Sequence, residues 1–307
     1  MGGVITPLAP LIAAVALGYG LLRLGFFDDR FRRGLDKLVY WVCLPALMVD
    51  LLWAGGPDLR SAGLASVALG LGSCAVAAVA YAVGSVGRML GPAKATLAQA
   101  AFRGNLAFVG LPVVVLASPE LGGLAALAMG PLVVLYNLLA VPMLIVGGSG
   151  DRSGLLRVLM KSLTTNPLIW ACAAGLAGAA SGTAPPTWLG ETLSLIGKPA
   201  SPLALLSVGG AMAVFPLHGR LGASLLATVL KTAACPLISV AIAVALGCQG
   251  GELRVVAILA STPAAVASYV LATQLKGDHA LAAGAVILST LASVVSLAAA
   301  LAWTAPG

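Results

Sequence analysis

The most informative stretch of the sequence reads Phe102-Arg103-Gly104-Asn105-Leu106-Ala107-Phe108-Val109-Gly110-Leu111-Pro112, an apolar run that carries an arginine, an asparagine and a proline. Pro112 has no N–H to donate to the carbonyl of Phe108 and its ring crowds that carbonyl, so we expect the helix to break or kink there. The later stretch Ser261-Thr262-Pro263 predicts a second interruption that frees the carbonyl of Leu259, with Thr262 and Ser268 near enough to hydrogen-bond it. In lipid, freed backbone groups are tolerated only where protein or a water-filled cavity receives them.

The composition identifies an integral membrane protein. Of 307 residues, 60% are hydrophobic and only 9% are charged, which leaves too few charges to cover one core with a water-facing shell. A soluble enzyme, a disordered tail and a coiled coil are excluded on this basis. The net charge of +7 is then expected to reflect cytoplasmic loops, not nucleic-acid binding. The five cysteines share no CxxC spacing, so we interpret them as small hydrophobic residues, with neither disulfides nor a metal site.

Ten membrane spans are expected, because a spanning helix needs about 20 mostly apolar residues. The apolar N-terminal stretch lacks a basic region and a clear cleavage site, so we interpret it as the first span and not as a signal peptide. The joining segments are too short for a soluble domain. The predicted spans are 4–24, 35–53, 63–87, 96–117, 122–146, 163–181, 188–213, 222–247, 253–274 and 281–303.

The loop cations predict the orientation of the chain. Loops after the odd-numbered spans hold 12 Lys and Arg residues, whereas the opposite side holds 2, Arg60 and Arg254. By the positive-inside rule the odd-numbered loops lie in the cytoplasm, and both termini lie outside.

The ten spans divide into two halves of five, and an odd number per half means that the second half crosses the membrane upside down. We therefore predict a first repeat over 1–146, a central cytoplasmic loop over 147–162 and a second, inverted repeat over 163–307. Three proline pairs fall in corresponding spans: Pro7 with Pro167, Pro45 with Pro202, and Pro112 with Pro263. Interrupted helices at matching places in inverted halves indicate a transporter's binding site. The alternative for each proline is a purely structural kink.

Charges within the spans suggest which ligand such a site would take. Arg103, Lys198 and Lys231 lie inside predicted spans, whereas Asp50 is the only deep carboxylate. A charge near the middle of a membrane helix costs about 2.5–3.5 kcal/mol on insertion scales, so such residues usually have a functional role. The excess of cations favours an anionic ligand. The alternatives are that the lysines extend toward the membrane surface and that Arg103 pairs with helix carbonyls.

The stretch from Arg103 to Pro112 resembles the fourth-span signature of the auxin efflux carrier family of bacterial and plant transporters. Further stretches fit the family in the same order, so that the resemblance covers nearly the whole chain. They are Leu17-Gly18-Tyr19-Gly20, Leu44-Pro45-Ala46-Leu47, Asn166-Pro167-Leu168-Ile169, Ser201-Pro202-Leu203-Ala204-Leu205, Lys231 to Pro236, and Ser289-Thr290.

The resemblance implies an all-α, ten-span fold similar to the bile acid sodium symporters, in which broken spans 4 and 9 cross near mid-membrane. It implies an organic anion as substrate and a rocking or elevator-like movement. Asn105 would hold the substrate carboxylate, with Arg103, Ser261 and Thr262 as further site residues. Gly110, Pro112 and Pro263 would form the crossover.

The chain also departs from the plant members of that family. It lacks their long central cytoplasmic loop, which favours the bacterial branch and a bacterial inner membrane. It has Thr262 and Ala264 where plant members carry longer polar side chains, so auxin itself is a poor guess for the substrate.

Several questions stay open at this point. An intramembrane hydrolase would need a nucleophile and a base within hydrogen-bond reach, and the only histidines, His218 and His279, lie in predicted loops, so we expect no enzyme. A channel or a membrane-embedded sensor remains the alternative to a transporter. Coupling to H⁺ would use Asp50, whereas Na⁺ would use oxygens of Ser261, Thr262 and Asn105 with freed carbonyls. No resident cofactor or metal is expected. The predicted partners are a small organic anion and the lipid bilayer, without nucleic acid, and a homodimer is left open.

Overall fold

The structure is a computed structural model that describes residues 2–56, 58–148, 155–217 and 219–304. It is all-helical: within these ranges the only β-type pairing is an isolated antiparallel bridge between Gly104 and Ala264. Residues 149–154 of the predicted central loop, and His218, lie outside the described residues.

The first half of the chain contains α1 (Gly2–Arg23), α2 (Asp29–Leu38), η1 (Val39–Cys43), α3 (Leu44–Gly55), α4 (Leu59–Val86), α5 (Gly91–Phe102), η2 (Leu106–Gly110), α6 (Leu111–Ala117), η3 (Pro119–Leu121) and α7 (Gly122–Gly148). The second half contains α8 (Leu155–Thr164), α9 (Pro167–Ala180), α10 (Thr187–Gly197), α11 (Ala200–Val214), α12 (Leu221–Val229), η4 (Leu230–Ala234), α13 (Cys235–Ala245), α14 (Gly250–Ala260), α15 (Val266–Gln274) and α16 (His279–Trp303). The segments η1, η2 and η4 are π-helical turns, and η3 is a 3₁₀ turn.

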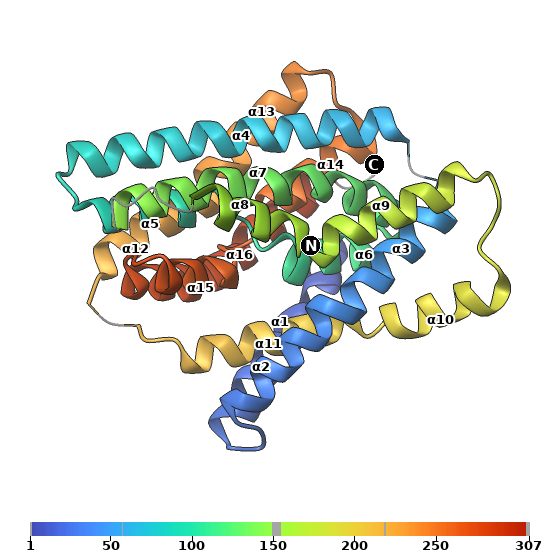
Figure 1. Ribbon diagram of the computed structural model, residues 1–307, viewed down its shortest axis with the longest axis horizontal. Coiled ribbons are helices and arrows are strands. Elements are labelled where there is room, and N and C mark those ends of the chain that lie inside the picture. The colour runs from blue at the N-terminus through green and yellow to red at the C-terminus, as the bar shows by residue number, and fades with distance from the viewer. Residues whose placement is uncertain (1, 57, 149–154, 218, 305–307) are drawn as a thin grey trace.

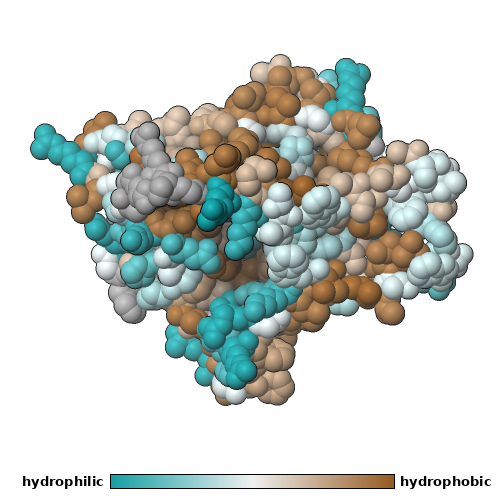
Figure 2. Space-filling model, viewed as in Figure 1, coloured by the Kyte–Doolittle hydropathy of each residue, from teal (hydrophilic) through white to brown (hydrophobic). Residues whose placement is uncertain are grey.

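The helices confirm a membrane protein that crosses the bilayer several times. Five continuous helical stretches among the described residues are long and apolar enough to span it: Asp29–Gly55, Leu59–Val86, Pro119–Gly148, Leu221–Ala245 and His279–Trp303. Shorter apolar helices add Leu8–Arg23, Leu106–Ala117 and Pro167–Ala180. Large apolar side chains such as Leu237 and Val295 point outward, and Figure 2 shows how much of the surface is hydrophobic. Such a surface suits lipid and not water.

The helices form two groups by their contacts; in Figure 1, α1, α2, α10 and α11 lie in the lower part, and α4, α5, α7 and α13 lie in the upper part. In the first, which we call the α1/α11 unit, α1 packs against α11, and α3 packs against α9 and α10. In the second, which we call the crossover unit, α4 packs against α5, α7 and α13, and α16 packs against α12 and α15. The α1/α11 unit comprises α1–α3 and α9–α11, and the crossover unit comprises α4–α7 and α12–α16.

The segment between α7 and α9 differs from the expected loop. The helix α8 starts within the predicted central loop and ends inside the predicted sixth span, so α9 begins only at Pro167. None of the described α8 residues is buried, and its Arg157 and Lys161 are exposed.

Of the break or kink expected at Pro112, the structure excludes the break: a π turn distorts the helix just before the proline, and the interruption lies earlier in the chain. The helix is interrupted at Arg103–Asn105 and then continues through Pro112, which is the second residue of α6. The π turn η2 precedes the proline, and the N–H of Leu111 donates to the carbonyl of Leu106, five residues back. A π turn re-satisfies the backbone groups that a proline frees and so lets the helix continue. Pro45 and Pro236 follow η1 and η4 in the same way.

Two glycines allow α1 and α11 to approach closely. A Cβ atom at Gly18 would lie 2.0 Å from the carbonyl oxygen of Leu206, and one at Gly209 would lie 1.9 Å from that of Val15. Small residues of this kind let membrane helices pack backbone to backbone, which maximises their van der Waals contact. The α1/α11 unit is therefore held together at positions where no side chain fits.

We predict that Gly18→Ala destabilises the protein by about 1–3 kcal/mol, because the methyl group must push α1 away from α11. The matched control is Gly20→Ala on the same helix, where nothing lies within 4 Å of the added atom. Because alanine favours a helix over glycine by up to about 1 kcal/mol, the control should be as stable as the parent or more stable. The thermal unfolding midpoint in detergent measures both, and equal midpoints for the two variants would contradict the close contact.

Candidate functional site

The two helix breaks meet inside the crossover unit. The helix α5 ends at Phe102 and α14 ends at Ala260, and the extended segments that follow them run antiparallel. The N–H of Asn105 donates to the carbonyl of Pro263 at 2.8 Å, and the N–H of Ala265 donates to that of Arg103 at 2.9 Å. Each break thereby satisfies backbone groups of the other, as the membrane interior requires.

The residues predicted at the crossover have different places in it. Pro263 lies in the crossing segment, whereas Pro112 lies beyond it in α6. Gly110 packs at the crossing, since a Cβ atom there would lie 2.8 Å from Leu259 Cδ2 and 3.1 Å from Thr262 Cγ2. Its lack of a side chain therefore allows η2 to pass close to the end of α14.

Thr262 has the backbone role expected of it, because its hydroxyl donates to the carbonyl of Leu259 at 2.7 Å. Ser268 does not share this role: its buried hydroxyl has no hydrogen-bond partner among the described residues. Ser261 and Thr262 are both buried, and neither is among the residues that line the cavity beside the crossing.

That cavity has a volume of about 450 Å³ and lies between the two units. Figure 2 shows a hollow near the centre of the face in view, bordered by hydrophilic side chains. The first residues of η2 and α15 line it, including Leu106, Ala107, Val266 and Ala267. The first N–H groups of a helix have no partner within the helix, so two helix N-termini present free donors and partial positive charge to this space.

Arg103 lines the cavity next to these helix ends. Its Nη1 and Nη2 both lie 3.2 Å from Oδ1 of Asn137, and Nη1 also donates to the carbonyl of Tyr136 at 3.3 Å. Asn137 and Tyr136 belong to α7, so this helix fixes the direction of the guanidinium group. An arginine has five N–H donors in one plane, and those not bonded to α7 remain for a ligand.

Asn105 also lines the cavity, although only 5% of its surface is exposed. Its backbone is fully engaged, since its N–H donates to Pro263 and its carbonyl accepts from Val109 and Gly110. Its side-chain amide, by contrast, has no hydrogen bond to any residue that the structure describes. A nearly buried amide beside a cavity is a natural partner for a bound polar group.

The remaining predicted residues lie elsewhere. Lys231 is 1% exposed and its Nζ donates to the carbonyl of Ala260 at 2.7 Å, on the crossing but outside the cavity lining. Lys198 is exposed between α10 and α11 and lies near enough to Asp50 to interact electrostatically. Asp50, the carboxylate that H⁺ coupling would use, does not line this cavity. Of the three predicted intramembrane cations, only Arg103 therefore faces the cavity.

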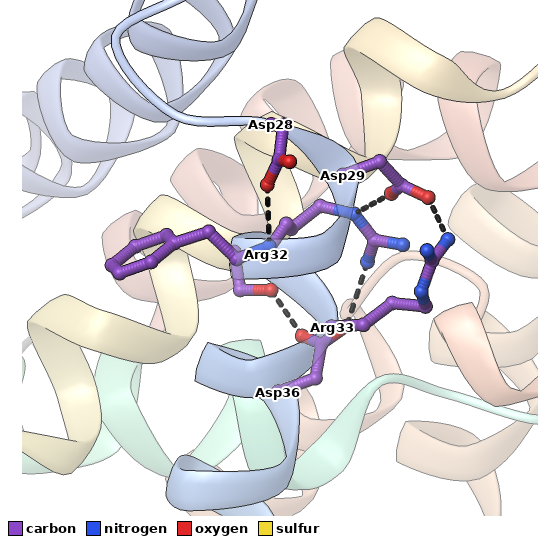
Figure 3. Close-up of polar contacts among 7 residues, drawn as sticks. Asp28, Asp29, Arg32, Arg33 and Asp36 are labelled. Atoms are coloured by element: carbon purple, nitrogen blue, oxygen red, sulfur yellow. Dashed lines mark hydrogen bonds and ion pairs between the residues drawn. The ribbon is translucent and has the colours of Figure 1, made fainter.

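Asp36 is a cavity residue that the sequence analysis missed. It belongs to a cluster on α2 in which both Asp29 and Asp36 bind the buried Arg32, with N–O distances of 2.7 and 2.6 Å (Figure 3). Asp36 also accepts a hydrogen bond from the hydroxyl of Ser207 on α11. The cluster ties α2 to α11, and the paired charges leave Asp36 a compensated carboxylate at the edge of the cavity.

Asn137 is the second missed residue, and here a signal was present. It is an amide within the apolar fifth span, next to Tyr136, and a polar side chain inside a membrane helix usually faces the protein interior or a cavity. Asp36 offered no such signal, because it lies among basic residues at the very start of the predicted span 35–53.

We predict that a cysteine in place of Ala267 reacts with a membrane-impermeant maleimide, because this exposed residue lines the cavity near the first turn of α15. The experiment uses a chain whose five native cysteines are replaced. The matched control is Ala285→Cys on α16, where the residue is fully buried and should stay unlabelled. Equal labelling of both positions, or of neither, would contradict a water-accessible cavity at this place.

Comparison with known proteins gives one result. The family model described as "Membrane transport protein" matches residues 3–145 and 152–301, which is nearly the whole chain. No curated protein matches the chain.

Among the described residues, no group of three or more His, Cys, Asp or Glu side chains is placed to hold a metal ion.

Proposed function

The chain belongs to the auxin efflux carrier family of membrane transport proteins, and we propose that it is a secondary transporter that moves a small organic anion by alternating access. The observation that carries the proposal is that Arg103 and the N-terminal ends of η2 and α15 meet at one cavity beside the crossing. The substrate class is a mono- or dicarboxylate.

The preference for an anion follows from the charges at the cavity. Helix N-termini carry about half a positive charge each and bind carboxylates and phosphates through their free N–H groups. Arg103 adds a full charge, and its attraction to a carboxylate at 4 Å is about 4 kcal/mol at an effective dielectric constant of 20. The carboxylate of Asp36 at the edge of the cavity is already paired with Arg32 and so repels an anion only weakly.

Asn105 and Asn137 complete the polar part of the site. The free amide of Asn105 would donate to a carboxylate oxygen, while Asn137 holds the Arg103 guanidinium toward the same space. Apolar and aromatic residues such as Tyr40, Phe108 and Val270 line the rest of the cavity and suit the carbon skeleton of an organic acid.

The division into two units supports alternating access. The cavity lies between the α1/α11 unit and the crossover unit, so a movement of one unit against the other would close it on this side and expose the crossing on the other. The close glycine contacts of α1 with α11 favour a rigid α1/α11 unit. We propose that the crossover unit carries the substrate in an elevator-like movement.

An inverted repeat of two five-span halves remains part of the proposal. In support, α1 packs on α11 while α3 packs on α9, which are equivalent contacts when the first and second halves are exchanged. The loop cations favour a cytoplasmic mouth for the cavity, since Asp36 and Lys37 follow the basic loop after α1. Both termini would lie outside a bacterial inner membrane. Counterflow of labelled substrate in vesicles separates this transporter from a channel or a sensor.

We predict that Arg103→Gln loses most of its affinity for carboxylates, whereas Arg103→Lys retains part of it. Lysine keeps the charge but not the planar fork that grips two oxygens. Asn137→Asp should also weaken binding, because the new carboxylate would neutralise Arg103. Binding is measured by thermal shift with a panel of mono- and dicarboxylates, since a ligand stabilises by RT ln(1 + [L]/Kd). A neutral analogue of the same shape is the control ligand, and parental carboxylate binding by Arg103→Gln would refute the assignment.

We predict that a reporter fused after Gly307 reports an outside location. An alkaline phosphatase fusion should be active there, and a reporter that fluoresces only in the cytoplasm should stay dark. The physical reason is the excess of 12 loop cations over 2 on the opposite side. The reverse pattern would exclude the proposed orientation without affecting the site.

A further inference from the structure

The end of α14 lies inside the protein, where the last carbonyls of a helix have no partner within it. The carbonyl of Leu259 accepts from the Thr262 hydroxyl at 2.7 Å, and that of Ser261 accepts from the Ser296 hydroxyl at 2.9 Å. Between them, the carbonyl of Ala260 accepts from Nζ of Lys231 at 2.7 Å. Every carbonyl from 259 to 261 thus has a donor, and one of these donors is a cation.

Lys231 reaches this place from the π turn η4 and is 1% exposed. Its Cε atom lies 3.4 Å from where a Cβ atom of Gly104 would be, so its side chain rests against the break in the fourth span. Its Nζ lies 3.5 Å from the Cys235 sulfur, and no carboxylate among the described residues forms an ion pair with it. Burying an ion costs several kcal/mol. The compensation seen here is the Ala260 carbonyl and the negative end of the α14 dipole.

Unwound carbonyls and the C-terminal ends of half-helices are the groups with which secondary transporters bind coupling cations. We infer that the crossing contains a monovalent cation site whose permanent occupant is the ammonium group of Lys231. The carbonyls that a free Na⁺ would need are taken by Lys231, Thr262 and Ser296. The inference of this cation site depends only on the contacts at the crossing. Its consequence, that transport needs no Na⁺, also depends on the proposed function.

The test is to empty the site and refill it. Lys231→Ala removes the ammonium group and leaves room for a small cation, so the thermal unfolding midpoint of the purified protein should fall. Adding ethyl-, propyl- or butylammonium should raise the midpoint again in this variant only. Tetramethylammonium, which has no N–H donor, should not. Lys198→Ala is the matched control, because that lysine is exposed, and it should neither lose stability nor respond to alkylammonium ions.

Two further results would overturn the inference. The first combines two observations. A Lys231→Met variant, which keeps the shape of the side chain without its charge, is as stable as the parent, and the Lys231→Ala variant is not stabilised by any of the cations. The second is a saturable stabilisation of the parent chain by Na⁺ but not by choline, which needs no variant to detect. Carboxylate binding by the parent is measured in parallel. Its absence would count against the proposed function and leave the cation site standing.

Discussion

The two backbone hydrogen bonds between the broken segments are the constraint on which the structure depends. An unpaired peptide group in a lipid-like interior costs several kcal/mol. Neither the interruption between α5 and η2 nor the one between α14 and α15 could therefore exist alone. Paired as Asn105 with Pro263 and Ala265 with Arg103, the two interruptions are stabilised together. Four helix ends are thereby brought to one place in the membrane interior.

The four ends differ in sign, and the protein treats the two signs differently. The end of α14 is negative and is met by Lys231, while Arg103 caps the end of α5 through its backbone N–H. The N-terminal ends at Leu106 and Val266 are positive and line the cavity. The ammonium group of Lys231 therefore compensates the negative end of α14, and the positive ends at the cavity support the proposed anionic ligand.

Hydropathy predicts a membrane protein with several spans, but it does not predict where a helix is interrupted: the predicted span 188–213, for example, is divided between α10 and α11. Pro112 predicts a break on its own chemistry, and the helix avoids that break because η2 widens by one residue, a choice that depends on packing around it. Pro263 lies in its break because Thr262 and the Arg103–Asn105 segment receive the freed groups.

Site residues follow the same distinction. Arg103 was predicted as a ligand-site residue because charges are rare in apolar spans, and Asn105 because the family resemblance implies it; both line the cavity. The hydrogen bond from Lys231 to the carbonyl of Ala260 could not be predicted in this way. It depends on where α14 ends in space, and the sequence around Lys231 carries no information about that.

The π turns before Pro45, Pro112 and Pro236 also bear on how such a chain can vary. A turn with one extra residue rotates everything that follows by about 100° around the helix axis. Removing one residue from such a turn and replacing its proline would restore a regular α-helix. The residues after the turn would then rotate, so that different side chains would face the cavity and the lipid. Inserting or deleting a single residue within a span therefore does more than change its length, because it also changes which helix face meets the cavity and which meets lipid.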